Sequence, residues 1–195
     1  MSIMETMQLR NLLITTGLLL VTNVASAEVL LSHRIIYYDI YGSTHQQLKQ
    51  EMVSKGNIRA DYISSANTEV SYNSKVTKSR QGSSCKVEHI KILVDVVQTY
   101  PKWINMYRGS QSLIDEWNQF MAASVTHEDR HMSEGLEVAS KLDQHLQSFN
   151  WSSDCRTIDK QLNEESHKIL DDYKNNGSLV YDRETNHGLN NGTRW

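Results

Sequence analysis

The segment His127–His131 reads H-E-D-R-H and therefore contains an H-E-x-x-H motif. Four residues make just over one helical turn, so both imidazoles would project from one face of a helix, about 6 Å apart at their roots. Two ring nitrogens placed in this way can bind one zinc ion at about 2.0–2.1 Å. Glu128 would lie beside the ion as a general base, taking a proton from the attacking water and returning it to the leaving amine. The motif predicts a catalytic Zn²⁺ site, although imidazole also binds copper, nickel and iron.

A third protein ligand must come from outside this motif, because catalytic zinc usually has three protein ligands and one open position. Metzincins have a glycine and a third histidine further along the same stretch of chain, where this sequence has Glu134 and Glu137. That class is therefore excluded. The alternative to any metal site is an exposed, charged helix face on which Arg130 pairs with a nearby acid.

The segment Tyr181–Gly188 is the best source of further site residues, since it holds a phenol, two carboxylates and an imidazole. His187 could complete a three-histidine site, and Gly188 would let the backbone approach closely. Tyr181 could donate a hydrogen bond to the oxyanion that develops on the substrate. Asp182 could orient a ligand imidazole or ligate in place of His187. The other candidates for the third ligand are Glu184 and His167.

The elements before the motif alternate as strands do. Strands are expected over 30–40, in 59–76 and over Cys85–Val97, with Pro101 as the end of the last strand and a polar turn over 77–84. Thr44 is expected to cap a short helix that contains Leu48 and Met52.

After Pro101 the pattern is helical. Ser110 or Ser112 could cap a long helix whose apolar stripe runs from Leu113 to Phe149, with an interruption possible at Gly135. A second helix is expected over about 158–173, ended by Asn175-Asn176-Gly177. Strands first and helices afterwards predict an α+β fold, with N-terminal antiparallel strands packed on the long H-E-x-x-H helix and on a second, C-terminal helix.

Residues 1–27 have the features of an export signal. Arg10 precedes the apolar run Leu12–Val24, and Ala25-Ser26-Ala27 is an A-x-A cleavage pattern. The run is short and polar for a membrane-spanning helix, so no stable membrane insertion is expected after cleavage. The alternative is a retained anchor. Residues 28–195 are predicted to form a single domain, periplasmic or secreted.

Cys85 and Cys155 are the two cysteines of the chain. In an exported protein an isolated pair is expected to form a disulfide. Two metal-ligating thiols are the alternative, which the absence of a C-x-x-C pattern disfavours. The formal net charge of −3 gives no basic surface for nucleic acid, so a nucleic-acid partner is not expected.

These residues together resemble a bacterial family of predicted secreted zinc-dependent proteases, which has H-E-x-x-H and a late Y-D-x-x-T-x-H-G motif. Both motifs occur here in the family's order, at His127–His131 and at Tyr181–Gly188, with the two cysteines between and before them. The resemblance covers nearly all of residues 28–195. It implies zinc at His127 and His131, Glu128 as the base, a functional role for His187, and pairing of the cysteines.

Three functions are compatible with these patterns. The first is a metallopeptidase that acts on a protein or peptide substrate outside the cytoplasm. The second keeps the zinc site but hydrolyses cell-wall amides, since both reactions add water to an amide carbonyl. The third is a disulfide-bonded envelope protein whose histidines hold a structural or transported metal, which would require a closed site of four protein ligands.

Overall fold

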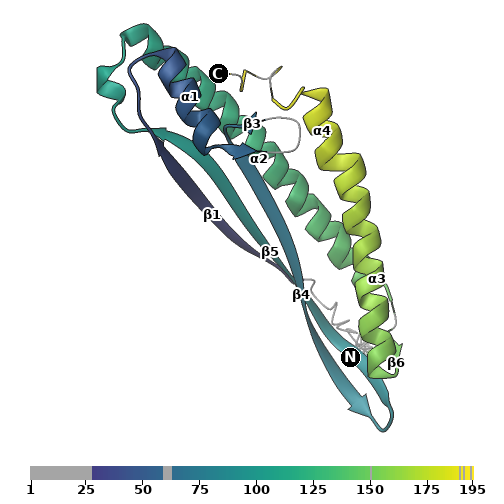
Figure 1. Ribbon diagram of the computed structural model, residues 1–195. Coiled ribbons are helices and arrows are strands. Elements are labelled where there is room, and N and C mark those ends of the chain that lie inside the picture. Colours follow the sequence, from purple (N-terminus) through teal and green to yellow (C-terminus); the bar gives the residue numbers. More distant parts are fainter. Residues whose placement is uncertain (1–27, 59–62, 150, 189, 191, 194) are drawn as a thin grey trace, which may run out of the picture.

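A computed structural model describes residues 28–58, 63–149, 151–188, 190, 192, 193 and 195. The predicted export signal in 1–27 lies outside the described residues. The α+β class is confirmed: a long, twisted sheet lies against the helices α2 (Gln111–Gln147) and α3 (Cys155–Tyr173), and α1 (His45–Lys55) lies at one end of the sheet (Figure 1). Figure 1 shows α2 running along the sheet and α3 returning beside α2.

The sheet contains three long strands in the order β1 (Glu28–Ile40), β5 (Ser84–Trp103) and β4 (Asn67–Gln81). The short β6 (Ser152–Ser153) also pairs with β5, and β2 (Asn57–Ile58) pairs with β3 (Ile63–Ser64) separately. β4 is antiparallel to β5, as expected, but β1 is parallel to β5. The sheet is therefore mixed, because the chain crosses over through α1 and β4 before it enters the central strand.

The strands β4 and β5 are longer than their sequences predict. The polar stretch expected as a turn over 77–84 continues β4 to Gln81, and the turn is confined to Gly82 and Ser83. Gly82 has φ 64°, a conformation that favours glycine. β5 also continues past Pro101 to Trp103. Its ladder with β4 ends at Thr99, so the N–H that proline lacks costs no bond to β4 there.

The helices α1, α2 and α3 each begin at a side-chain cap. The Thr44 hydroxyl accepts from the N–H of Gln47 at the start of α1 (His45–Lys55), and the Ser110 hydroxyl accepts from that of Leu113 at the start of α2 (Gln111–Gln147). Asp154 caps α3 (Cys155–Tyr173). A short 3-10 helix, η1 (Met106–Arg108), precedes α2.

The helix α2 is continuous through Gly135, where an interruption was expected. A Cβ placed on Gly135 would lie 2.9 Å from both methyl carbons of Val70, and the Tyr72 hydroxyl donates to the Gly135 carbonyl at 3.0 Å. This glycine therefore lets β4 approach α2 closely, one turn after the H-E-x-x-H motif.

The segment expected to end the second helix instead widens it. The chain passes from α3 through a π-helical turn, η2 (Lys174–Ser178), into α4 (Leu179–Glu184) without a break. Gly177 faces the ring of Tyr173, and a Cβ there would lie 2.7 Å from that ring. A π turn rotates the residues that follow it relative to the preceding helix, and such turns are frequent at functional sites.

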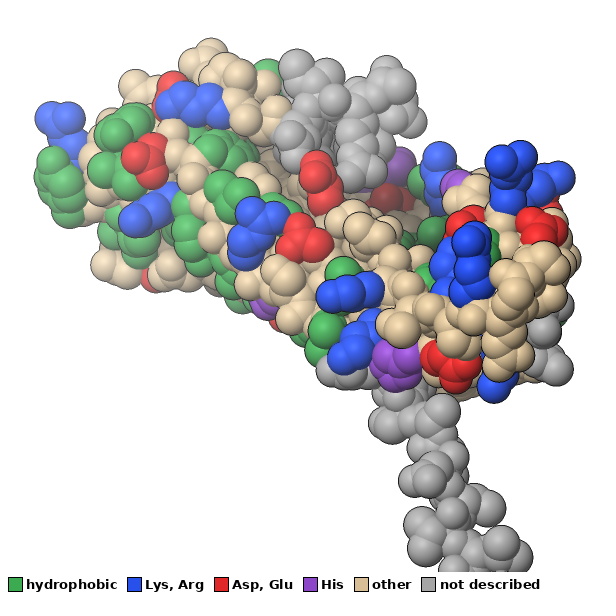
Figure 2. Space-filling view, turned by 90° about the horizontal axis from the view of Figure 1, so that it is seen from below, with side chains coloured by type: hydrophobic (Ala, Val, Ile, Leu, Met, Phe, Trp, Pro, Cys, Tyr) green, Lys and Arg blue, Asp and Glu red, His purple; other side chains and the backbone are tan. Residues whose placement is uncertain are grey.

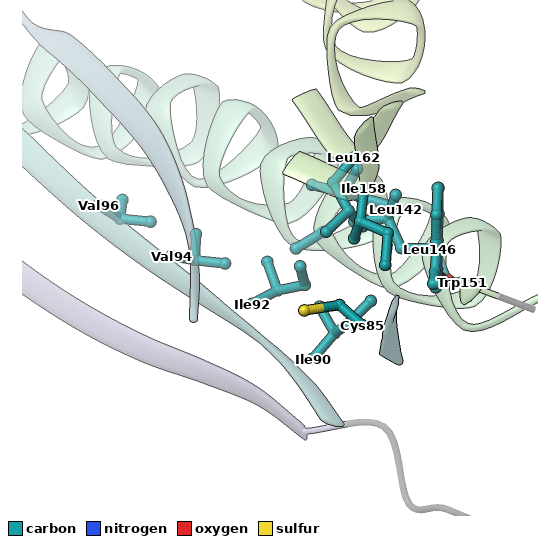
Figure 3. Close-up of a cluster of buried hydrophobic side chains, with 11 residues drawn as sticks. Cys85, Ile90, Ile92, Val94, Val96, Leu142, Leu146, Trp151, Ile158 and Leu162 are labelled. Atoms are coloured by element: carbon teal, nitrogen blue, oxygen red, sulfur yellow. Dashed lines mark hydrogen bonds between the residues drawn. The ribbon is translucent and has the colours of Figure 1, made fainter. Parts of the chain in front are cut away.

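Two apolar clusters hold the helices on the sheet. One lies between β5, α2 and α3, where Ile92, Leu142 and Ile158 meet, and a disulfide joins Cys85 to Cys155 beside it, as predicted (Figure 3). The other packs Leu48 of α1 against Trp103, Trp117 and Phe120 near the start of α2. The H-E-x-x-H motif lies between these clusters along α2.

The edge strand β1 leaves apolar side chains exposed. In Figure 2, hydrophobic side chains spread over the left part of the molecule with single charged groups between them. The exposed apolar residues of β1 are Val29, Leu30, Leu31, Ile35, Ile36 and Tyr37.

No helix in the described part of the chain is long and apolar enough to cross a membrane.

Candidate metal centre

The middle of α2 places three ionisable side chains of the motif in the interior. His127 and Glu128 are 5% exposed and His131 is 8% exposed, so the interpretation of this segment as a solvated, charged helix face is wrong. The neighbouring Asp129 is held by the sheet: Gln98 of β5 donates from Nε2 to Asp129 Oδ1 at 3.1 Å. On the β4 side, the Thr68 hydroxyl donates to the Glu128 carbonyl at 3.1 Å. Both contacts fix the rotation of α2 at the motif.

Three candidate ligand atoms converge on one point. The Nε2 atoms of His127 and His131 are 3.2 Å apart, and Asp182 Oδ1 lies 3.0 Å from His131 Nε2 and 3.5 Å from His127 Nε2. Ligands about 2.0–2.1 Å from a tetrahedral ion are spaced about 3.3 Å from one another, which matches these separations. Two imidazoles and a carboxylate are also a donor set that zinc accepts. The residues therefore fit a metal ion with a fourth position left for another ligand.

Among the described residues, this is the group that could hold a metal ion, and its third member is Asp182. The sequence left the third ligand open between His187, Asp182, Glu184 and His167. The side chain of Asp182 is buried, whereas those of the other three candidates are exposed. The structure thus brings together His127, His131 and Asp182, and it places His187 outside the group.

The rest of the Tyr181–Gly188 segment builds the turn that follows Asp182. The backbone N–H of His187 donates to the Asp182 carbonyl, and that of Gly188 donates to the Thr185 hydroxyl. His187 and Gly188 have φ values of 54° and 81°. A Cβ on Gly188 would lie 2.1 Å from Thr193 Oγ1, so glycine is required here. The late motif therefore has a structural role: it ends α4 in a left-handed turn that fixes the position of Asp182.

Tyr181 contacts the rings of both histidines. Its ring stacks on that of His127 with centroids 4.9 Å apart, and it meets the ring of His131 edge-on at 5.1 Å. The Arg130 guanidinium lies 5.9 Å from the centroid of the Tyr181 ring. α4 thus contributes one candidate ligand and one aromatic wall.

The second nitrogen of His131 has a partner that the sequence did not suggest. Ser178 Oγ in η2 lies 3.4 Å from His131 Nδ1. A proton on Nδ1 would be donated to Ser178, which leaves the Nε2 lone pair directed at the cluster. No local pattern in the sequence marks Ser178, because its position depends on the π turn.

Glu128 lies beside the group without belonging to it. Its Oε2 is buried and has no hydrogen-bond partner among the described residues. Burial raises the pKa of Glu128, an effect that the nearby Thr68 hydroxyl and the two histidines only partly oppose. A buried carboxylate whose pKa is raised is better suited to accept and return a proton than an exposed one.

The electrostatics of the three candidate ligands are coupled. Burial raises the pKa of Asp182, but hydrogen bonds from His127 and His131 lower it more, so the net pKa is well below its usual range. Burial lowers the pKa of His131, yet the adjacent Asp182 carboxylate outweighs this, and the net pKa is raised. In the absence of a metal ion, both shifts favour a protonated His131 imidazole beside an ionised Asp182 carboxylate.

Comparison with known proteins gives one match. The model of a family described as bacterial protein of unknown function (DUF922) matches residues 35–188, which include both site segments. No curated protein and no solved structure matches the chain.

Proposed function

The chain belongs to DUF922, a bacterial family of unknown function, and we propose that it is an exported zinc-dependent metallopeptidase. The observation that carries this proposal is the convergence of His127 Nε2, His131 Nε2 and Asp182 Oδ1 beside the buried carboxylate of Glu128. Three ligands and a neighbouring base form the arrangement that metal-assisted hydrolysis requires, whereas a purely structural zinc site has four protein ligands.

In this proposal His127, His131 and Asp182 hold the ion. When bound, zinc polarises a carbonyl and lowers the pKa of water to about 7. Ser178 orients His131 through Nδ1, and the left-handed turn after α4 holds Asp182 in place. His187 has no ligand role here, since its backbone supports Asp182 while its side chain is exposed.

Glu128 is the general base of the proposal. Its buried Oε2 takes a proton from the attacking water, and the same oxygen then delivers it to the nitrogen of the leaving amine as the C–N bond breaks. Burial favours this cycle because it raises the pKa of the carboxyl towards that of the groups with which it exchanges the proton.

Tyr181 is assigned the role of oxyanion donor. It lies against both histidines, so the substrate carbonyl would be polarised within its reach. Removing one such donor costs about 10²–10³-fold in kcat in other hydrolases. Tyr181→Phe should therefore lower kcat by about that factor while the zinc content stays unchanged.

The proposed compartment is the periplasm or the extracellular medium. The Cys85–Cys155 disulfide requires oxidising conditions, and the composition of 1–27 supports export.

The first experiment measures metal content per chain in signal-free protein that is purified without a histidine tag. About one zinc per chain is expected in the wild type and in Glu128→Gln, and much less in Asp182→Ala. Peptide hydrolysis by Glu128→Gln should fall by about 10²–10⁴-fold. Glu137→Gln, an exposed change on the same helix, is the matched control.

Three outcomes would contradict parts of this proposal. Essentially no bound metal, even after zinc is offered, would contradict the assignment of a metal centre. Undiminished peptide hydrolysis by Glu128→Gln would contradict the assignment of Glu128 as the general base. Zinc binding with cleavage of peptidoglycan fragments, but not of peptides, would favour the amidase.

A further inference from the structure

A cavity of about 250 Å³ opens beside His131. Val70 and Tyr72 of β4 form one wall, and Leu170 and Tyr173 of α3 form the other. Ser178 of η2, which also contacts His131 Nδ1, lies at the end of the cavity that is next to the candidate metal ligands. Thr68 and Lys174 complete the lining, so the cavity is largely apolar and aromatic along its sides and adjoins the candidate metal ligand His131 at one end.

A longer groove of about 540 Å³ continues from this cavity, and the two share Tyr72 and Leu170. The groove runs between β4 and α3 as far as Lys78 and Asp159, which form an ion pair between its walls. Cavity and groove together lead from His131 along a large part of β4.

The strand β4 forms an edge of the sheet. In the described residues it pairs with β5 on one side, and it stands last in the strand order β1-β5-β4. Asn73 and Ser74, adjacent residues that point to opposite faces of a strand, both line the groove. The groove therefore follows the open edge of β4, where backbone N–H and C=O groups can pair with an added strand.

We propose that an extended polypeptide binds in this groove by adding a strand to the edge of β4, with a large apolar side chain in the cavity beside His131. This inference rests on the proposed peptidase function and names its substrate class. The occupant is a polypeptide rather than a glycan, because the cavity walls are Val70, Leu170 and the rings of Tyr72 and Tyr173, which suit a leucine or phenylalanine side chain.

The first test changes the size of the cavity. Leu170→Trp should fill it, and Glu164→Trp, an exposed change on the same helix, is the control. Capped octapeptides with Leu, Phe or Gly at one central position serve as probes. We expect the wild type and the control to cleave the Leu and Phe peptides about 10–100-fold faster than the Gly peptide, measured as kcat/KM. Leu170→Trp should abolish that preference by lowering kcat/KM for the Leu and Phe peptides to about the value for the Gly peptide, while the zinc content stays unchanged.

The second test addresses strand addition by binding rather than by activity. Zinc-loaded Glu128→Gln is titrated calorimetrically with the Leu octapeptide carrying one N-methyl group at each position in turn. Because alternate residues of an added strand bond to the edge, every second N-methyl group should weaken binding by about 10-fold or more, and those between should not.

The outcomes separate this inference from the proposed function. Peptide cleavage with a preference that Leu170→Trp leaves unchanged, or N-methyl effects without a two-residue period, would overturn the groove proposal and leave the peptidase standing. Zinc binding without cleavage of any peptide would overturn both.

Discussion

Two regions of α2 bury their inward faces in opposite ways. In the C-terminal half, Ala139, Leu142 and Leu146 pack against the sheet and α3. The middle of the helix buries polar side chains instead, and Glu128 Oε2 and His127 Nδ1 have no hydrogen-bond partner among the described residues. Buried apolar groups stabilise a fold, whereas a buried polar atom without a partner costs about 1–3 kcal/mol. The C-terminal half of α2 therefore stabilises the fold, whereas the buried polar groups in the middle of α2 lower the stability of the fold.

The geometry of the rest of the molecule supports this division. The disulfide lies at the apolar region, and the other side chains labelled around Cys85 in Figure 3 are aliphatic or aromatic. The polar region is held by single contacts from several elements: Gln98 of β5, Thr68 of β4, Ser178 of η2 and Asp182 of α4. Changes in one region should alter stability, and changes in the other should alter metal binding.

The largest effect on stability is expected from loss of the disulfide. Its sequence separation of 70 residues should make the cross-link worth about 4 kcal/mol in the free energy of unfolding on the chain-entropy model. The double variant Cys85→Ala/Cys155→Ala should lose about that much in urea unfolding, while zinc affinity per folded molecule stays the same. A parallel loss of zinc affinity would show that the two regions are not separate.

Leu146→Ala tests the same difference between the two regions without removing the disulfide. Leu146 is 1% exposed in the apolar cluster, and such truncations cost about 2–5 kcal/mol. We expect the midpoint of urea unfolding to fall with an unchanged slope, and the zinc dissociation constant to stay within about 2-fold of the wild-type value. Lys141→Ala, an exposed change on the same helix, should alter neither.

What the sequence predicts follows the same division. Periodicity and caps are local, so the patterns located the H-E-x-x-H helix and offered Ser110 or Ser112 as its cap, of which Ser110 is the one used. The two cysteines indicated their disulfide. The identity of the third candidate ligand was left open because Asp182 reaches the cluster through the π turn at Lys174–Ser178. Asn175-Asn176-Gly177 predicts a helix end, whereas in the structure the segment stays helical and Gly177 lies close against the ring of Tyr173.

The sequence-based prediction was also wrong about part of the sheet. The parallel direction of β1 depends on pairing with β5, a partner distant in the sequence, and the extension of β4 to Gln81 depends on hairpin pairing with the start of β5. Polar residues at the end of β4 predict a turn when read alone, yet they suit a strand whose two faces are both solvated. The pairing of the strands, and not their local composition, decides these features.

The pH dependence of stability should reverse sign when zinc binds. In the metal-free protein the pKa of His131 is raised, so its contribution is full below about pH 6.5 and is lost as pH rises through the folded-state pKa. The raised pKa of Glu128 acts in the same direction from about pH 4.5 upward. The lowered pKa of Asp182 contributes stability above about pH 4, which is lost at more acidic pH.

The metal-free protein should therefore lose stability as the pH rises above about 6.5, while stabilisation by zinc grows in the same direction because zinc competes with protons for the imidazoles. Thermal unfolding at several pH values, with and without zinc, measures both trends. If the melting temperature depended on pH in the same way with and without zinc, the proton and the metal would not share a site. The His131→Asn variant should remove most of the difference between them.

The smallest effect is expected from Ser178→Ala, which tests how the polar region is held. The Ser178 hydroxyl lies 3.4 Å from His131 Nδ1, and loss of such an orienting partner lowers metal affinity by about 10–100-fold in other zinc proteins. We expect a decrease near the lower end of that range, about 10-fold, because the contact is long. The melting temperature of the metal-free protein should not change, and Ser140→Ala on the exposed face of α2 is the control. A fall in stability without a change in affinity would mean that Ser178 serves the packing of η2, and that the polar region is positioned by Asp182 and the sheet alone.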